Sequence, residues 1–388
     1  MRTSLQQTTQ LFSNFGKEEI IRYSRHFALP QVGVAGQKKL KNAKVLCVGA
    51  GGLGSPLLLY LAAAGVGTIG IVDSDKVDLS NLQRQILYSQ TDQNRSKVIA
   101  AQEKLNNLNS SIEIIPHPYQ LNDENALELI NQYDIVADGT DNYATRYLIN
   151  DACFYAKKPN VHASIFQFEG QCSVFAATKG PCYRCLFAEA PPAGLIPNCA
   201  EGGVLGVLPG IMGSLQATEV IKLILGIGQP LIGRLLMFDA LSMTFRELQI
   251  EKNARCVLCQ KQQPFQDLPR PKICEINRNS LQTDVAEISV QQLKKMRSQK
   301  EKFTLLDVRN PYEFAICNLG GTLVPLPQLA EQSENLDRSE LIIVHCKSGQ
   351  RSRIAVQLLH RLGFSKVKNL HGGILAWANE IDPTMRQY

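Results

Sequence analysis

A glycine-rich hexapeptide, Gly49 to Gly54, constrains the fold of this chain more than any other feature. The sequence GAGGLG directly follows the apolar run 44–48, and Ser55 and Pro56 then supply an N-cap and a first-turn proline for a helix. Glycines in such a turn let the backbone approach a phosphate, and free N–H groups at the helix start attract its charge. The pattern predicts a phosphate-binding loop, and a tight turn without a ligand is the alternative.

Strand-like and helical patterns alternate around this loop. The predicted strands are 44–48, 68–72, 112–115 and 134–137, and the predicted helices are 55–64, 95–108, 143–157 and 211–225. Such alternation predicts a Rossmann-like α/β domain with a parallel sheet flanked by helices. The uncharged stretch 45–72 is long enough for a membrane span, but its glycines and proline favour a buried strand, turn, helix and strand.

A second α/β series follows a polar, proline-containing segment that begins at Lys261. Its predicted strands are 303–307 and 341–345, and its predicted helices are 290–296 and 352–362. A chain of 388 residues with 44% hydrophobic and 20% charged residues suits two globular domains. We therefore predict a first domain at 1–262, a linker at 263–286 and a smaller α/β domain at 287–388.

Charge and thiol content narrow the function classes. The net charge of +6 is spread along the chain without a basic block, so we expect no nucleic-acid partner. The N-terminal segment lacks the regions of a signal peptide. Eleven cysteines in a chain without such a signal favour reduced thiols for metal binding or catalysis. We expect a cytoplasmic protein that has no contact with a membrane.

Asp73 ends the second predicted strand and could accept hydrogen bonds from a ribose, as in dinucleotide-binding dehydrogenases. The segment DSDKVDLSNLQRQ, then Lys97, then DGTDN at 138–142 favours another class. Over about residues 22–260 the chain resembles the ubiquitin-activating-type adenylyltransferases, in particular the MoeB/ThiF-type enzymes of molybdopterin-synthase activation and thiamine biosynthesis. In that family the glycine loop binds ATP.

The resemblance implies a role for each matching residue. The implied ATP-binding residues are Gly49, Gly51, Gly52 and Gly54 in the loop, Asp73 at the ribose, Asn81, Arg84 and Lys97 at the phosphates, and Asp141 at Mg²⁺. Arg25 would reach into the ATP site of a neighbouring subunit, which implies a homodimer. Attack of a carboxylate on the α-phosphate builds negative charge, and arginine, lysine and Mg²⁺ stabilise it, so Arg84 and Asp141 are candidate catalytic residues.

Two C-x-x-C pairs predict a metal site. Cys182, Cys185, Cys256 and Cys259 together offer the four thiolates of a closed tetrahedral Zn²⁺ site. A redox role of either pair is the alternative. The same two pairs occur in the adenylyltransferase family, where the resemblance implies a structural zinc.

Two further cysteines could carry sulfur or acyl groups. Cys199 lies in a glycine-rich stretch, and by the resemblance it could accept an acyl group or resolve a disulfide; an inert loop thiol is the alternative. Cys346 follows an apolar strand and precedes a helix, whose N–H groups would stabilise a thiolate or persulfide.

The spacing after Cys346 separates two chemistries. Cysteine phosphatases place an arginine six positions after the cysteine, whereas here Arg351 comes one position earlier and Ser352 takes that place. With Asp307, Glu313 and the segment Gly372 to Trp377, the region 290–388 resembles a rhodanese. The stretch AICNLGGT departs from the rhodanese pattern, which has a histidine there.

The two resemblances imply one enzyme with adenylyltransferase and sulfurtransferase activities. Its substrate would be a ubiquitin-like sulfur carrier that ends in Gly-Gly, of the molybdenum-cofactor pathway, with a persulfide donor such as a cysteine desulfurase upstream. A thiamine-pathway carrier and a tRNA-thiolation modifier stay open. A nucleotide- and carrier-binding scaffold is the non-enzyme alternative, and a dehydrogenase is disfavoured because no separate domain with a catalytic histidine follows.

Overall fold

The computed structural model describes residues 12–176, 179–190, 203–261, 263–269 and 285–388. The chain divides into two compact units, 1–275 and 276–388, and each has its own sheet. This division falls within the segment 263–286 that the sequence predicts as a linker, and the domain bounds themselves stay predictions.

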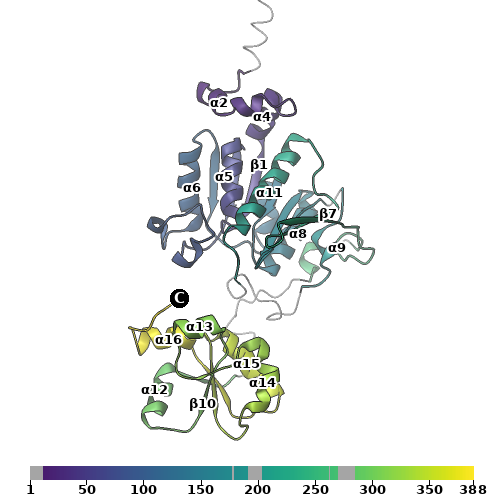
Figure 1. Cartoon of the computed structure of the whole chain (residues 1–388). Helices are drawn as coiled ribbons and strands as arrows, with labels where there is room; N and C mark the ends of the chain where they lie inside the picture. The colour runs from purple at the N-terminus through teal and green to yellow at the C-terminus, as the bar shows by residue number, and fades with distance from the viewer. Residues whose placement is uncertain (1–11, 177–178, 191–202, 262, 270–284) are drawn as a thin grey trace, which may run out of the picture. The chain divides into compact units, whose positions relative to one another are not determined.

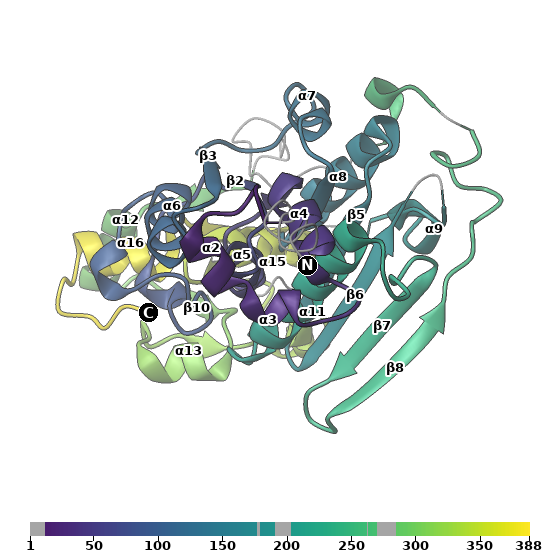
Figure 2. The ribbon, with the colours of Figure 1, turned by 90° about the horizontal axis from the view of Figure 1, so that it is seen from above.

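The N-terminal unit is built on an eight-stranded sheet with the order β3-β2-β1-β4-β5-β6-β7-β8. Its strands β1 and β7 are labelled in Figure 1. The strands β3, β2, β1, β4 and β5 run parallel, and β6, β7 and β8 are each antiparallel to the preceding strand. The strands are β1 (Lys44–Val48), β2 (Thr68–Val72), β3 (Glu113–His117), β4 (Ile135–Asp138), β5 (Asn160–Phe166), β6 (Glu169–Phe175), β7 (Arg234–Asp239) and β8 (Thr244–Gln249). Figure 2 shows β7 and β8 at one side of this unit.

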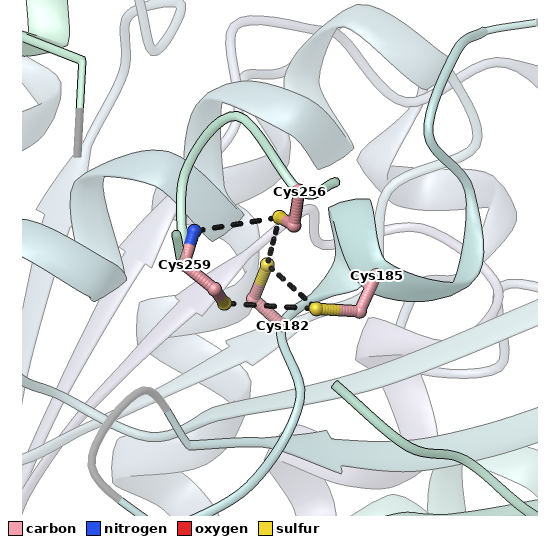
Figure 3. Close-up of side chains that lie close together, drawn as sticks. All are labelled: Cys182, Cys185, Cys256 and Cys259. Atoms are coloured by element: carbon pink, nitrogen blue, oxygen red, sulfur yellow. Dashed lines mark hydrogen bonds between the residues drawn. The ribbon is translucent and has the colours of Figure 1, made fainter. Parts of the chain in front are cut away.

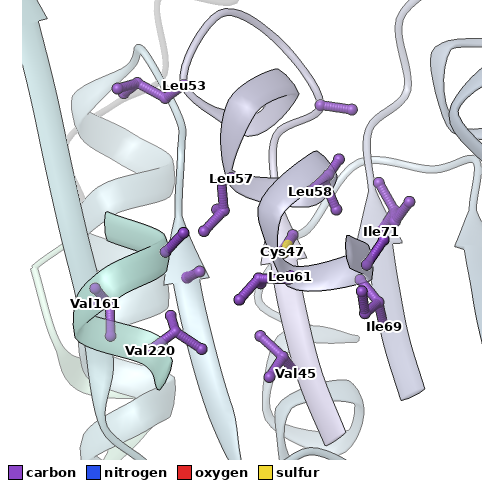
Figure 4. Packing of buried hydrophobic residues seen from close by; sticks show 14 of the residues in the cluster. Val45, Cys47, Leu53, Leu57, Leu58, Leu61, Ile69, Ile71, Val161 and Val220 are labelled. Carbon is purple, nitrogen blue, oxygen red and sulfur yellow. The ribbon is translucent and has the colours of Figure 1, made fainter. Parts of the chain in front are cut away.

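Helices cover both faces of the sheet. The described helices are α2 (Lys17–Arg22), α3 (Ser24–Phe27), α4 (Gly33–Asn42), α5 (Gly54–Ala64), α6 (Lys97–Leu108), α7 (Ala126–Asn131), α8 (Tyr143–Ala156), α9 (Tyr183–Leu186) and α11 (Leu208–Leu225), with 3-10 turns η1 (Leu79–Asn81), η2 (Gln90–Asp92) and η3 (Phe265–Asp267). Val45 and Cys47 of β1 pack against α5, α6 and α11, whereas Leu46 and Val48 pack against α7 and α8. Both faces are therefore buried in apolar side chains, which explains why β1 is apolar at successive positions rather than alternating. Figure 4 shows the face of Val45 and Cys47, with Leu61 of α5 and Val220 of α11.

The stretch 45–72 forms a strand, a glycine turn, a helix and a strand, as predicted. α11 is the one helix of the described chain that is long and apolar enough to cross a membrane. Half of it is buried in the unit, where Leu208, Met212 and Val220 belong to the core and the helix contacts α5 and β5. α11 therefore has the packing of a core helix.

One edge of the sheet gathers the loops that follow the parallel strands. Gly49 follows β1, Asp73 follows β2 and Asp141 lies in the loop after β4. The turn between β7 and β8 lies at the same edge, because Asp239 at the end of β7 pairs with Glu169 at the start of β6. Ligands of open parallel sheets bind at this carboxyl edge.

The C-terminal unit has a parallel five-stranded sheet with the order β11-β10-β12-β13-β9. Its strands are β9 (Glu287–Ile288), β10 (Thr304–Asp307), β11 (Thr322–Leu323), β12 (Ile342–His345) and β13 (Val367–Leu370). Its helices are α12 (Val290–Ser298), α13 (Pro311–Ile316), α14 (Leu329–Gln332), α15 (Gln350–Arg361) and α16 (Gly373–Glu380), with 3-10 turns η4 (Leu326–Gln328) and η5 (Ser333–Asn335). α14 and α15 pack on one face and α12 and α16 on the other. Both units thus have the predicted α/β class.

Candidate functional site

Four cysteines of the N-terminal unit lie together (Figure 3). The sulfur atoms of Cys182 lie 3.8 Å from Cys185 and 3.7 Å from Cys256, and that of Cys185 lies 3.6 Å from Cys259. Tetrahedral Zn²⁺ with bonds of about 2.3 Å would hold its sulfur ligands about 3.8 Å apart. The donor set and its spacing therefore fit zinc.

The surroundings of the cluster hold the first pair in place. Arg184, between Cys182 and Cys185, is buried and donates two hydrogen bonds of 2.7 Å to Asp151 of α8. It also donates to the carbonyl of Pro269, and Leu268 packs beside the cysteines. Thiol hydrogen bonds from Cys182 lower the pKa of Cys185. Arg184 thus joins α9 to α8 and to the segment 263–269 beside the cluster.

Backbone crowding explains two of the four loop glycines. Gly49 has a φ of +92°, and a Cβ there would lie 2.9 Å from the carbonyl oxygen of Gly139. A Cβ at Gly54 would lie 2.2 Å from the carbonyl oxygen of Gly49. At Gly51 the nearest atom is the side chain of Gln85 at 3.5 Å, so the fold alone does not require glycine there. A glycine at position 51 instead suits the close approach of a phosphate to the backbone.

Asp73 and Tyr88 fix the loop from two sides. The N–H of Ala50 donates to Asp73 Oδ2 at 2.8 Å, and the Tyr88 hydroxyl donates to the Ala50 carbonyl at 2.8 Å. The N–H of Asp75 donates to the other carboxylate oxygen of Asp73. Burial raises the pKa of Asp73. The predicted ribose residue therefore also orients the loop, a role that sequence reasoning did not assign to it or to Tyr88.

The predicted phosphate-binding residues lie around the same loop. Arg84 donates to Asn81 Oδ1 at 2.8 Å, and its Cγ would be 3.6 Å from a Cβ at Gly52. Lys97 opens α6 and is buried, and its Nζ lies 2.9 Å from Asp75 Oδ2, a carboxylate that is itself 68% exposed. Two cations are therefore held near the loop by polar partners.

The end of β4 and the loop that follows it carry two aspartates with different environments. Asp138 is fully buried, accepts from both the N–H and the hydroxyl of Thr140, and lies 2.8 Å from Nδ1 of His162. Burial is the largest single influence and raises the pKa of Asp138, but the hydrogen bond with His162, the nearby charge of Arg146 and the hydrogen bond from Thr140 together outweigh it, so the net shift is downward. Asp141 is exposed at the carboxyl edge. Asp138 therefore shapes the loop, and Asp141 remains open to a ligand.

Arg25 lies at the other edge of the sheet. It follows Tyr23, which accepts a hydrogen bond from Asn109 and lies against Gly65 at the end of α5. α5 starts at the glycine loop and its 11 residues span about 16 Å. The structure therefore does not bring Arg25 to the glycine loop of its own chain, and its role in a partner's site stays a prediction. Cys199 lies outside the described residues.

Cys346 directly follows the buried strand β12 of the C-terminal unit and is 1% exposed. The N–H of Gly349 donates to its sulfur at 3.2 Å and the hydroxyl of Ser352 at 3.4 Å. Gly349 is the N-cap of α15, so the start of this helix faces the sulfur. Such donors favour a sulfur anion over a neutral thiol.

Glu313 and Arg351 tie the cysteine loop to α13. Arg351 donates to both carboxylate oxygens of Glu313, at 2.7 and 2.6 Å. Burial is the largest single influence and raises the pKa of Glu313, but the charge and hydrogen bonds of Arg351, the N–H of Asn310 and the hydroxyl of Tyr388 together outweigh it, so the net shift is downward. Behind this pair, Arg309 makes a buried ion pair with Asp307 at 2.6 Å.

Each of the two sites lies in a region that matches a known protein family. Residues 23–258 match the ThiF family, and residues 289–380 match the rhodanese-like domain. The chain belongs to the ThiF family. It is 44% identical over 406 residues to the probable adenylyltransferase/sulfurtransferase MoeZ of Mycobacterium tuberculosis (strain ATCC 25618 / H37Rv), with 100% of both chains covered. It is 40% identical to the adenylyltransferase and sulfurtransferase MOCS3 of Aedes aegypti, with 100% of this chain and 95% of the relative covered.

A solved structure supports the fold of the ThiF domain. Escherichia coli MccB with ATP has 25% identity and a TM-score of 0.55, covering 61% of this chain and 74% of MccB. MccB with a MccA derivative, MccA-N7isoASN, gives a TM-score of 0.56 with the same identity and coverage. Together the comparisons confirm the predicted fold and enzyme class, a ThiF-type adenylyltransferase joined to a rhodanese-type sulfurtransferase, and ATP binding fits that family.

Proposed function

We propose that this ThiF-family enzyme activates the C-terminal glycine of a ubiquitin-like sulfur carrier with ATP and then converts it to a thiocarboxylate. The observation that carries the proposal is the presence, in one chain, of a glycine loop flanked by Arg84 and Lys97 and of a cysteine whose sulfur accepts hydrogen bonds at the start of a helix. The relatives named adenylyltransferase and sulfurtransferase support it.

Adenylation requires stabilisation of charge at the α-phosphate. An oxygen of the carrier's terminal carboxylate attacks phosphorus, the bond to the bridging oxygen breaks, and pyrophosphate leaves. Arg84 and Lys97 offset the charge that builds on these oxygens. Mg²⁺, which the exposed Asp141 would hold, would neutralise the same phosphates. Arg25 of a second copy would complete the site in a homodimer.

Sulfur transfer follows on the acyl-adenylate. The terminal sulfur of a Cys346 persulfide attacks the carbonyl carbon, AMP leaves, and an acyl disulfide joins the carrier to Cys346. A thiolate then attacks the Cys346 sulfur, which releases the thiocarboxylate and leaves a disulfide that a cellular dithiol reduces. Cys199 is the proposed thiolate, and transfer through a Cys199 thioester is the alternative order. An upstream persulfide donor, such as a cysteine desulfurase, recharges Cys346.

Zinc at the four cysteines would have a structural role. Four thiolates close the coordination sphere, so no position remains for a substrate. The metal would join two segments that lie far apart in the sequence.

The outer strand of the sheet offers a docking surface for the carrier. All six residues of β8 are exposed, and Leu241, Met243, Phe245 and Leu248 form an apolar surface on β8 and its turn. An unpaired edge strand can accept a strand of another protein. Because the turn lies at the carboxyl edge, a carrier docked here could extend its C-terminal tail along that edge towards the glycine loop.

The carrier decides the pathway. We propose a molybdopterin-synthase type carrier, and a thiamine-type carrier and a tRNA-thiolation modifier are the alternatives. The test is ATP–pyrophosphate exchange with each purified carrier ending in Gly-Gly, followed by mass spectrometry of the carrier C-terminus. Exchange and thiocarboxylate with one carrier identify the pathway. Absence of exchange with every carrier, from folded and zinc-loaded protein, would favour a scaffold that binds nucleotide and carrier.

A further inference from the structure

Tyr388, the last residue of the sequence, contacts the cysteine loop of the rhodanese domain. Its hydroxyl donates to Glu313 Oε1 at 2.8 Å and accepts from Arg309 Nη1 at 2.8 Å. The Nζ of Lys347, the residue after Cys346, lies 4.5 Å from the centre of the Tyr388 ring. Burial raises the pKa of Tyr388, so the phenol keeps the proton that it donates.

The contacts of Tyr388 lead to both ends of the loop. At one end, the ring holds the ammonium of Lys347 by a cation–π contact. At the other end, Glu313 accepts from Tyr388 and from Arg351 through the same oxygen, Oε1. Arg351 directly precedes Ser352, whose hydroxyl donates to the Cys346 sulfur.

The helix that precedes Tyr388 binds the same loop. The N–H groups of Ile374 and Leu375 in α16 donate to the carbonyls of Cys346 and Lys347, at 2.9 and 3.0 Å. A Cβ at Gly373 would lie 2.4 Å from the Cys346 carbonyl oxygen, so only glycine permits this approach. α16 and the segment after it therefore hold the loop backbone and the loop side chains together.

We propose that Tyr388 is a positioning residue for the sulfur-carrying loop of Cys346. It orients Glu313 so that Arg351 stays at the loop, and its ring holds the ammonium of Lys347, the residue after Cys346. The substrates that depend on this arrangement are anionic sulfur donors, because Tyr388 holds the cationic side chain of the residue that directly follows the cysteine. The inference rests on the proposed role of Cys346. Tyr388 lies outside the residues on which the resemblance to a rhodanese was based.

The test uses the full chain with two substitutions of Tyr388 that remove different parts of its side chain. Y388F removes the hydroxyl but keeps the ring under Lys347, whereas Y388A removes both contacts. Q387A is the matched control, because Gln387 is the neighbouring residue and donates to Asn379 rather than to the loop. Thiosulfate serves as the donor and cyanide as the acceptor: Cys346 takes the outer sulfur and releases sulfite, and cyanide then takes that sulfur as thiocyanate.

We expect Y388F to lower kcat/KM for thiosulfate about tenfold, since hydrogen bonds to charged groups lose about that factor or more when removed. Y388A lowers it further and raises KM for thiosulfate, because Lys347 is no longer held. In both variants the pH profile of Cys346 alkylation by iodoacetamide moves to higher pH. ATP–pyrophosphate exchange and the Q387A variant stay unchanged.

Two results would overturn the inference. The first is wild-type kcat/KM and a wild-type alkylation profile in both variants. The second is a loss of activity that follows only a loss of folded domain, seen as a lower unfolding midpoint in Y388F with an unmoved alkylation profile. C346A separates this inference from the proposed function: sulfur transfer that survives C346A refutes the role of Cys346 itself, whatever Tyr388 does.

Discussion

His345 is expected to make the rhodanese domain sensitive to acid. It lies at the end of β12, directly before Cys346, and its side chain is fully buried. Neither ring nitrogen makes a hydrogen bond within the described residues, and the nearest carboxylate oxygen, Asp307 Oδ2, lies 3.6 Å away. Burial lowers the pKa of His345 to about 4, and Asp307 offsets only part of this effect.

The lowered pKa fixes the sign and size of the pH effect. Between pH 6.5 and about 4 the unfolded chain takes up a proton at His345, whereas the folded domain does not. The free energy of unfolding of the domain is therefore highest above pH 6.5, and it decreases as the pH falls towards about 4. A pKa lowered from 6.5 to about 4 corresponds to roughly 3 kcal/mol.

The single tryptophan provides a domain-specific assay. Trp377 lies in α16, is 8% exposed and belongs to the core of the C-terminal unit. Urea unfolding of the full chain followed by its fluorescence reports this unit alone. Between about pH 7 and about pH 4.5 we expect the urea midpoint to fall by about 1.2 M, for a slope of about 2 kcal/mol/M.

A substitution isolates the contribution of His345 from that of the carboxylates. H345Q cannot titrate, so most of this pH dependence should disappear even if the variant is less stable at pH 7. H360Q is the matched control, because His360 is exposed on α15 of the same domain. The reasoning is refuted if H345Q keeps the pH dependence of the wild type, since the proton uptake would then belong to other groups.

Four further outcomes follow from the sites. D141N should lower ATP–pyrophosphate exchange by about a hundredfold and leave thiosulfate–cyanide transfer intact, because the metal contribution is worth several kcal/mol; surviving exchange contradicts the Mg²⁺ assignment. C346A should abolish thiocarboxylate formation and leave exchange unchanged; loss of both would contradict separate sites. C256S should release zinc, measured by metal analysis, and lower the Tm by about 5–10 °C from about 3 kcal/mol of lost stability; a zinc-replete variant would contradict the four-ligand site. L241D should raise KM for the carrier about tenfold without changing KM for ATP, as expected for one apolar contact made charged at an interface; a normal carrier KM would place docking elsewhere.

Local patterns explain why the two sites could be predicted from the sequence. The glycine loop and the Cys346 loop each lie between a strand and the helix that follows it, so a short sequence window contains the whole turn. The cluster of four cysteines could also be predicted, because two C-x-x-C pairs in one chain are typical of a tetrahedral zinc site. The sequence did not distinguish the glycines that the backbone requires, Gly49 and Gly54, from Gly51, which leaves room for a ligand.

Contacts between distant residues explain what the sequence did not reveal. Glu313 meets Arg351 and Tyr388 across 38 and 75 positions, and no periodic pattern records such a contact. The edge strand β8 was not predicted, because all six of its residues are exposed and the strand lacks the alternation of a half-buried strand. The two aspartates of DGTDN look alike in sequence, and only the buried partners of Asp138 separate it from Asp141.

The two sites share one structural arrangement, a strand, a loop and the N-terminus of a helix, which can stabilise an anion. β1 leads through a glycine loop to α5, and β12 leads through the Cys346 loop to α15, so in each case a helix N-terminus faces the reacting group. The first arrangement suits phosphate and the second suits sulfur. The chemistry needs both, since a carboxylate is a poor electrophile until its oxygen leaves as AMP, and a persulfide can displace AMP only from an activated carbonyl. In the proposed reaction, the presence of both activities in one chain raises the local concentration of the persulfide relative to a separate donor protein, which favours sulfur transfer over hydrolysis of the acyl-adenylate.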